Sequence, residues 1–248
     1  MIRAESFSSI QTFLRCPKAY ENRYILKMKQ EPSFAMKRGS DIHEEISSNK
    51  EETEQALYAK KFYKRTDKNE YVNLANPGEC VQNLFECHFG IKRKEDKEFE
   101  FCKFDDESCF FRGVADLVTL YYKKTIENPI IEVEKIKIID WKTGKSSGDR
   151  KQLLSYALCL YYMLDVEKIE AQFVYLDQER ESKKYFFNKE DIESIEKEIK
   201  RDIEIIQNTS SFEARENWTC NGCNHKKNCD LFKPLKEEKN LSNLIESL

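Results

Sequence analysis

The stretch IIDWKTG at residues 138–144 decides the fold of this chain of 248 residues. Two isoleucines lead directly into Asp140, so the stretch predicts a buried strand that ends in a carboxylate. Side chains two apart on a strand point to the same side, so we expect Asp140 and Lys142 to face one site. A second apolar stretch, RGVADLV at residues 112–118, predicts a neighbouring strand that carries Asp116.

Asp116, Asp140 and Lys142 have the chemistry of a centre that hydrolyses phosphodiesters. Carboxylate oxygens bind Mg²⁺ or Mn²⁺, the ion acidifies a water, and a lysine orients that water or stabilises negative charge as it develops. An isolated D-x-K tripeptide also has a simpler interpretation, a salt bridge at a strand end, because such tripeptides arise often by chance. The flanking sequence has to decide between the two.

The flanking segments predict an α/β fold with a mixed central sheet flanked by helices. Residues 98–104 and 109–121 predict a β-hairpin around the polar turn 105–108, and residues 168–187 predict another. Isoleucines at spacings of three and four from Ile192 to Ile206 predict an amphipathic helix. We expect one domain over residues 1–248: a mainly helical arm and insert (1–97), a catalytic sheet core (98–187), a helix and cysteine cluster (188–232) and a polar tail (233–248).

The N-terminal arm should be helical as well. Ser6 or Ser8 can cap a first helix that runs to about Tyr20, and a second helix begins near Ser40 and carries His43. Residues 50–97, rich in charged and aromatic side chains, suggest further helices.

Charge and hydropathy set limits on the partners. The net charge is -3, so attraction to nucleic acid must be local. Residues 1–40 hold eight Lys and Arg against three Glu, a net charge of +5, which suits a phosphate-facing arm or, equally, a solvated helical face. The polar start and the lack of a long apolar run predict a soluble, intracellular protein that makes no contact with membranes.

Four short motifs occur in order along the chain, and none is specific alone. They are GSDIH at residues 39–43, GVAD at 113–116, DWK at 140–142, and Gln152 with Tyr156. In this order they resemble the PD-(D/E)XK nuclease superfamily, in particular its RecB-like branch, with its G-x-x-x-H, G-x-x-D, D-x-K and Q-x-x-x-Y patterns. The resemblance implies a restriction-endonuclease-like core and favours the nuclease interpretation of Asp140 and Lys142.

Carried over residue by residue, the resemblance implies that His43, Asp116, Asp140 and the backbone carbonyl of Trp141 bind Mg²⁺ or Mn²⁺. It makes Lys142 the catalytic lysine. Gln152 and Tyr156 lie four apart, hence on one helical face, where they would steady the centre and touch the DNA backbone. A lone helical histidine is often structural, and Tyr156 is also a candidate core aromatic, because its neighbours are apolar.

The cysteines form a second constellation. Cys220, Cys223 and Cys229 have the spacing C-x2-C-x5-C, and Cys16 stands near the other end of the chain. Three clustered thiols need a fourth ligand, and both zinc and iron-sulfur clusters accept four sulfurs. His225 could replace one thiol at a zinc site. The remaining cysteines, 80, 87, 102, 109 and 159, show no ligand spacing and are expected to be buried thiols.

A resemblance to known nucleases favours an iron-sulfur cluster over zinc. RecB-like nucleases with a four-cysteine staple, such as the CRISPR-associated exonuclease family and the AddB helicase-nuclease subunit, have one cysteine before the active site and three after it. Their S-x-[IL]-x-x-[FY]-x-x-C-P-x-x-[FY] pattern is matched from Ser8 to Tyr20. The resemblance implies a 4Fe-4S cluster, structural in role, on Cys16, Cys220, Cys223 and Cys229, with zinc as the alternative.

The leading hypothesis is a single-strand DNA exonuclease that needs Mg²⁺ or Mn²⁺, uses a two-metal-type mechanism and needs no ATP. Its pathway would be DNA repair, recombination, viral DNA processing or CRISPR adaptation. The alternatives are a module with weak or no catalysis that binds DNA ends for a partner helicase or integrase complex, and a redox sensor in which the cluster controls DNA binding. The basic arm would guide single-stranded ends.

Overall fold

The computed structural model describes residues 3–48, 50, 52–63, 72–73, 79–95, 98–123, 132–144 and 148–232, with backbone alone at 72–73 and 79–80. The chain divides into two compact units. Within the described residues, one consists of residues 3–7 and 32–207 and is called the sheet unit. The other consists of residues 8–31 and 208–232 and is called the cysteine unit. The expected polar tail at 233–248 lies outside the described residues.

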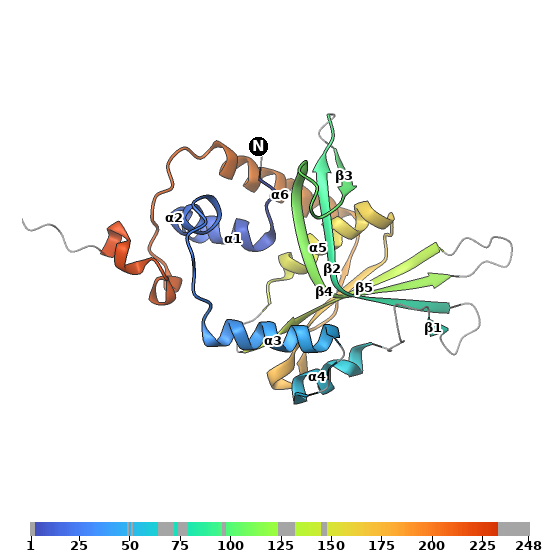
Figure 1. Ribbon diagram of the computed structural model, residues 1–248. Helices are drawn as coiled ribbons and strands as arrows, with labels where there is room; N and C mark the ends of the chain where they lie inside the picture. The colour runs from blue at the N-terminus through green and yellow to red at the C-terminus, as the bar shows by residue number, and fades with distance from the viewer. Residues whose placement is uncertain are drawn as a thin grey trace, which may run out of the picture. The chain divides into compact units, whose positions relative to one another are not determined.

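The sheet unit is a mixed α/β unit, as the sequence predicts (Figure 1). Its helices are α3 (Phe34–Ser48), α4 (Glu54–Ala59), α5 (Arg150–Leu164) and most of α6 (Lys189–Asn208), with short 3-10 turns η2 (Lys60–Phe62) and η3 (Leu176–Gln178). Its strands are β1 (Val72–Asn73), β2 (Glu79–Arg93), β3 (Phe99–Cys102), β4 (Cys109–Lys123), β5 (Glu132–Lys142), β6 (Ile169–Tyr175), β7 (Arg180–Glu181) and β8 (Tyr185–Phe187). No helix among the described residues is both long and apolar enough to span a membrane.

The sheet has the order β1-β2-β4-β5-β6-β7, with β3 paired to β2 and β8 to β6. All neighbours are antiparallel except β5 and β6, which run parallel from Ile136↔Ile169 to Lys142↔Tyr175. Helix α5 connects these two parallel strands, as a parallel connection requires. It begins at Asp149, whose carboxylate accepts the Lys151 N–H at 2.9 Å as a helix cap.

Three layers meet at β5, because its side chains alternate between two faces. Asp140 faces α5, whose Gln152 donates to it. The next residue, Trp141, belongs to a buried apolar cluster on the other face. That cluster joins α3 and α4 to the sheet and contains Ile42, Ile46, Ala56, Ala59, Leu117, Ile139, Trp141, Val174 and Leu176. The strand therefore carries a polar site on one side and a dry core on the other.

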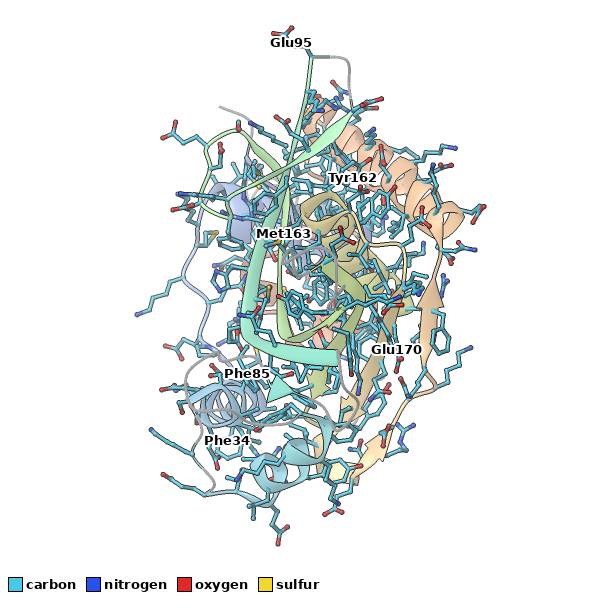
Figure 2. All side chains as sticks on the ribbon, turned by 90° about the vertical axis from the view of Figure 1, so that its right-hand side faces the viewer. Phe34, Phe85, Glu95, Tyr162, Met163 and Glu170 are labelled. Carbon is cyan, nitrogen blue, oxygen red and sulfur yellow. The ribbon has the colours of Figure 1, made fainter. Side chains whose placement is uncertain are left out.

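Two sequence expectations are wrong in this part of the chain. Residues 79–93 of the expected helical insert form the strand β2, whose residues Val81, Cys87, Phe89 and Ile91 are buried with a period of two. Residues 98–104 and 109–121 do contain strands, but β3 and β4 do not pair as a hairpin: both pair antiparallel with β2, on its two edges. The hairpin is β2 with β3, and Glu95 lies at its tip (Figure 2).

Other expectations are confirmed. The strand through Ile138 and Asp140, the amphipathic helix of isoleucines and the antiparallel pairing of β6 with β7 and β8 are all present. The helix that carries His43 begins earlier than expected, at Phe34.

The cysteine unit begins with two short helices in place of one. Helix α1 (Phe7–Arg15) ends before Cys16, and α2 (Pro17–Tyr20) begins at Pro17, followed by a π-helical turn η1 (Glu21–Ile25). Cys16 has an extended backbone, with φ -156° and ψ 103°. Proline disfavours helical geometry in the residue before it, which explains the break. The C-terminal part consists of the short 3-10 turns η4 (Trp218–Gly222), η5 (Lys226–Asn228) and η6 (Asp230–Phe232).

Candidate metal-dependent active site

The site forms where β4 separates from β5. The two strands pair from Lys123↔Glu132 to Leu117↔Ile139, and the next pair would be Asp116 opposite Asp140. There the ladder ends, and the backbone N–H of Trp141 donates to Asp116 Oδ2 at 2.7 Å instead. A side chain thus replaces a backbone acceptor, which satisfies the Trp141 N–H and fixes the Asp116 carboxylate beside β5.

His43 reaches this point from α3. Its Nδ1 lies 3.2 Å from Asp116 Oδ1. Burial opposes the charged imidazole, but the hydrogen bond to Asp116 and the charge of that carboxylate outweigh burial and raise the pKa of His43. Gly39, one turn earlier, faces the end of β5: a Cβ there would lie 2.9 Å from Thr143 Oγ1. The small residue lets α3 approach closely enough for His43 to reach the carboxylate.

Asp140 is the most buried charged group of the centre, with its residue 3% exposed. Oδ1 accepts from Gln152 Nε2 at 2.9 Å. Oδ2 lies 2.6 Å from Lys142 Nζ and forms an ion pair with it. Burial raises the pKa of Asp140 to about 6, and the negative charge of Asp116 adds to the rise.

Gln152 connects the remaining groups. Its Oε1 accepts from Lys142 Nζ at 3.0 Å, and its Nε2 donates to Tyr156 Oη at 2.8 Å as well as to Asp140. The ammonium of Lys142 also lies 5.2 Å from the centre of the Phe173 ring. A side-chain amide can donate to a carboxylate through its NH₂ group and accept from an ammonium through its carbonyl oxygen at the same time. Gln152 therefore holds the catalytic-lysine candidate against Asp140.

The four ordered motifs thus converge on one place. The structure brings together His43, Asp116, Asp140, Trp141, Lys142, Gln152 and Tyr156, which the sequence names one by one. Glu86 of β2 is an addition that the sequence analysis missed: its carboxylate and the ligand atoms of His43 and Asp116 all lie within 4.8 Å of one another. No sequence signal marks Glu86, because it stands in the charged segment that suggested helices.

The donor set fits a divalent cation. Two or three carboxylates and one imidazole are ligands suited to Mg²⁺ or Mn²⁺. Asp140 is buried beside Asp116, and a cation would offset the charge of the two carboxylates. Of the ligands that the sequence proposes, His43 and Asp116 lie with Glu86 within 4.8 Å of one another, and Asp140 and Trp141 lie beside Asp116.

The cysteine unit holds the second predicted constellation. Cys16, Cys220, Cys223 and Cys229 line one cavity of about 210 Å³, which His225 also lines. Two backbone N–H groups point at sulfur, Arg215 N to Cys16 Sγ and Asn217 N to Cys220 Sγ, each at 3.4 Å. Cys16 lies at least 204 positions before the other three cysteines in the sequence, yet all four line the same cavity.

Aromatic packing explains how the two chain ends meet within this unit. Phe13 and Tyr20 contact each other with ring centroids 5.6 Å apart, and both contact Phe212, at 6.2 and 6.0 Å. Backbone contacts add to this, since Arg215 Nη1 donates to the Leu14 carbonyl at 2.8 Å. The aromatic positions of the cysteine-containing motif thus hold residues 208–232 against α1 and α2.

The other cysteines are buried where their side chains are described. Cys87, Cys102, Cys109 and Cys159 are 9% exposed or less, and the side chain of Cys80 lies outside the described residues. Burial raises the pKa of Cys87 to about 11 and that of Cys102 to about 12. These thiols stay protonated and unreactive near neutral pH.

Comparison with known proteins identifies the class. Two carboxylates, a histidine and a lysine at the end of two strands make a centre of the metal-dependent nuclease type, and the model of the PD-(D/E)XK nuclease superfamily matches residues 4–230. The chain belongs to this superfamily. The solved structure of SSO0001 is similar at 16% sequence identity and a TM-score of 0.42, covering 91% of this chain and 86% of that one. A comparison with curated proteins found no match.

Proposed function

We propose that this chain is a single-strand DNA exonuclease of the RecB-like branch, in which His43, Asp116, Asp140 and Lys142 form the reaction centre. The observation that carries the proposal is the end of the β4 and β5 ladder at Asp116 and Asp140, where both carboxylates meet the ammonium of Lys142. A divalent ion bound there would acidify a water and polarise the phosphate.

The protein groups have distinct tasks in this proposal. Lys142, held between Asp140 and Gln152, stabilises negative charge that develops on the phosphate oxygens. Gln152 and Tyr156 keep the lysine and the carboxylate in register from α5. His43 fixes the orientation of Asp116 from α3. Electrostatic groups held in advance in this way cost no reorganisation when the reaction occurs.

A surface in the cysteine unit supports a single-stranded substrate. Trp218 is 79% exposed, and the guanidinium of Arg15 lies 5.9 Å from the centre of its ring. An exposed aromatic beside a cation suits base stacking and phosphate contact without sequence preference. Trimming of single-stranded ends is a step shared by DNA repair, recombination, viral DNA processing and CRISPR adaptation, and a helicase or integrase would supply such ends.

We also propose that Cys16, Cys220, Cys223 and Cys229 bind a 4Fe-4S cluster that joins the two chain ends. The four residues line one cavity, and a 4Fe-4S cluster takes one thiolate at each of its four irons. The order of the cysteines, one before the nuclease centre and three after it, supports the cluster over zinc.

Cleavage of end-labelled single strands in Mn²⁺ tests the nuclease. We expect the wild type to shorten the strands, and Asp140→Ala and Lys142→Ala to bind them without shortening. Lys168→Ala and Asp105→Ala, which change exposed residues away from the site, are matched controls that should cleave normally. If the wild type only retains the strands, the chain is an end-binding module. Cleavage undiminished in both site variants would overturn the assignment.

The cluster has an independent test. Protein purified without oxygen should be brown, contain about four iron and four sulfide per chain by the stoichiometry of a cubane cluster, and lose both in Cys16→Ser. Cys87→Ser, which alters a buried thiol of the sheet unit, should keep them. A colourless wild type that contains zinc would contradict the proposal.

A further inference from the structure

Glu86 occupies an unusual position in the middle of β2. Its backbone has φ 47°, in the left-handed region, although the residue is not glycine. The residues on either side pair normally with β4, Phe85 with Leu117 and Cys87 with Ala115. Left-handed backbone is costly for a residue with a long side chain, and it persists where the surroundings hold it and where it often serves a function.

The conformation brings the Glu86 carboxylate into the nuclease centre. In the β2 and β4 ladder, Glu86 stands opposite Asp116, the pair that is missing between Phe85↔Leu117 and Cys87↔Ala115. Phe85, the preceding residue, packs against the apolar cluster that includes Ile42 of α3, the helix that carries His43. Three elements thus deliver three ligands, His43 from α3, Glu86 from β2 and Asp116 from β4.

The distances between the ligand atoms of His43, Glu86 and Asp116 are close to those around a bound metal ion. Their ligand atoms lie within 4.8 Å of one another. An octahedral ion with bonds of about 2.1 Å holds its ligands no more than about 4.2 Å apart, so a small adjustment would close the set on one ion. Without an ion, the carboxylates of Glu86 and Asp116 lie close together and repel each other.

The charges of the centre give a separate reason for a cation. Asp140 is 3% exposed, and its Oδ2 lies 2.6 Å from the ammonium of Lys142. Asp116 and Glu86 place two more carboxylates beside His43. Lys142 offsets one of these three negative charges, and a histidine that binds a metal is neutral, so a divalent cation would offset the other two.

We propose that Glu86 is a metal ligand of the nuclease centre and forms, with His43 and Asp116, one of two positions for a divalent cation, so that Asp116, Asp140 and the Trp141 carbonyl would hold the other ion. The inference rests on the proposed function and deepens it, because it assigns the second ion of a two-metal mechanism to a residue outside the four motifs. Asp116 would contribute to both positions. Glu86 is exposed, so this position opens to solvent and to an incoming strand.

Direct measurement of Mn²⁺ binding to the full chain, by calorimetry and by the electron paramagnetic resonance of free Mn²⁺, tests the assignment without an activity assay. We expect two ions on the wild type. Glu86→Gln should lose one of them, or weaken the lower-affinity site by about tenfold or more. Glu107→Gln, the same chemical change at an exposed residue of the turn before β4, is the matched control and should bind two ions.

Glu86→Gly separates binding from folding. Glycine adopts a left-handed φ without strain, so this variant should unfold at a temperature no lower than that of the wild type when metal is absent. It should nevertheless lose the same Mn²⁺ ion. Retention of both ions in Glu86→Gln and Glu86→Gly would overturn the inference.

Mn²⁺ binding to the wild type and to Asp116→Asn separates a failure of the nuclease proposal from a failure of the role of Glu86. Asp116→Asn should weaken both ions, because it alters the shared ligand. If the wild type binds no Mn²⁺ at all, the nuclease proposal fails together with the inference. If the wild type and all Glu86 variants bind Mn²⁺ equally while Asp116→Asn does not, the nuclease proposal stands and the role of Glu86 alone is wrong.

Discussion

Gly113, the glycine of the GVAD motif, should tolerate no side chain. A Cβ at this position would lie 2.7 Å from Phe89 Cε2 and 3.2 Å from two ring carbons of Tyr156. Favourable contacts between carbon atoms lie at about 3.5–4.0 Å, so both rings would have to move. Phe89 is fully buried and packs edge-on against Tyr156 with ring centroids 5.5 Å apart, which leaves the two rings little free space.

The expected cost of Gly113→Ala follows from this geometry. Overpacking a buried site costs about 1–3 kcal/mol, and two displaced rings favour the upper half of that range, about 2–3 kcal/mol. For a chain of this size each kcal/mol lowers Tm by about 2–4 °C, so the melting temperature should fall by about 5–10 °C. Tyr156 would move with its ring and draw Gln152 away from Asp140, so cleavage should fall as well.

Thermal unfolding of metal-free protein, followed by circular dichroism, measures the effect. Gly222→Ala is the matched control, because no atom lies within 4 Å of a Cβ at that position. Phe89→Leu removes the nearest ring, so it should cost less in the Gly113→Ala background than in the wild type. A Gly113→Ala variant as stable as Gly222→Ala, or a double variant with additive costs, would refute the steric argument.

Two further changes probe the contacts that hold α3 and α4. Asp177 accepts from Arg38 at 2.7 and 3.0 Å and from the Gly144 N–H at 2.7 Å, and the Arg38 guanidinium, followed by the Gly144 N–H, lowers its pKa from 3.8 to about 2. The lowered pKa stabilises the fold above about pH 4, and this effect disappears as the pH falls toward about 2. A shift of nearly two pKa units adds at most about 2.5 kcal/mol to the free energy of unfolding. Because solvent screens the partly exposed arginine, we expect about 1 kcal/mol. Urea unfolding of Asp177→Asn should therefore differ from the wild type at pH 7, differ less at pH 3 and approach it at about pH 2, and a difference independent of pH would contradict this explanation. The buried carboxylate of Glu45 accepts from the Glu52 and Thr53 N–H groups and from Thr53 Oγ1, so Glu45→Ala should cost about 3 kcal/mol in urea unfolding, whereas a cost near zero would show that the start of α4 does not depend on it.

Sequence reasoning worked best where a short period fixes the geometry. Asp140 and Lys142 face one site because a strand repeats every two residues, and Gln152 and Tyr156 share a side because a helix repeats every 3.6. The observed contacts of Gln152 with Asp140, Lys142 and Tyr156 follow from those two periods once α5 packs beside β5. The residue spacing within each element does not show that β5 and α5 contact each other. The order of the motifs along the chain predicts that contact.

The errors arose where the partner of a strand, or a backbone irregularity, decides the outcome. The polar turn 105–108 marks a change of direction but does not specify a partner, and β2, unrecognised as a strand, takes the place between β3 and β4. The alternation of β2 is hard to recognise because polar Asn83 and apolar Leu84 interrupt the period of two between Val81 and Cys87. A strand of this kind is stabilised by its neighbours on both edges and not by its own pattern.

Glu86 and Gly113 both show that a sequence motif alone does not reveal which residues the centre needs. Gly113 belongs to a motif, yet the reason for its lack of a side chain is the Tyr156 ring, which lies more than forty residues further along the chain. Glu86 belongs to no motif, yet its left-handed backbone directs a carboxylate at His43 and Asp116. Because β2 is the strand that supplies both Glu86 and Phe89, it positions one group beside Asp116 and restricts the space around Tyr156. The strand β2 therefore borders the nuclease centre, and substitutions at Glu86 and at Phe89 should alter metal binding and the α5 contacts independently.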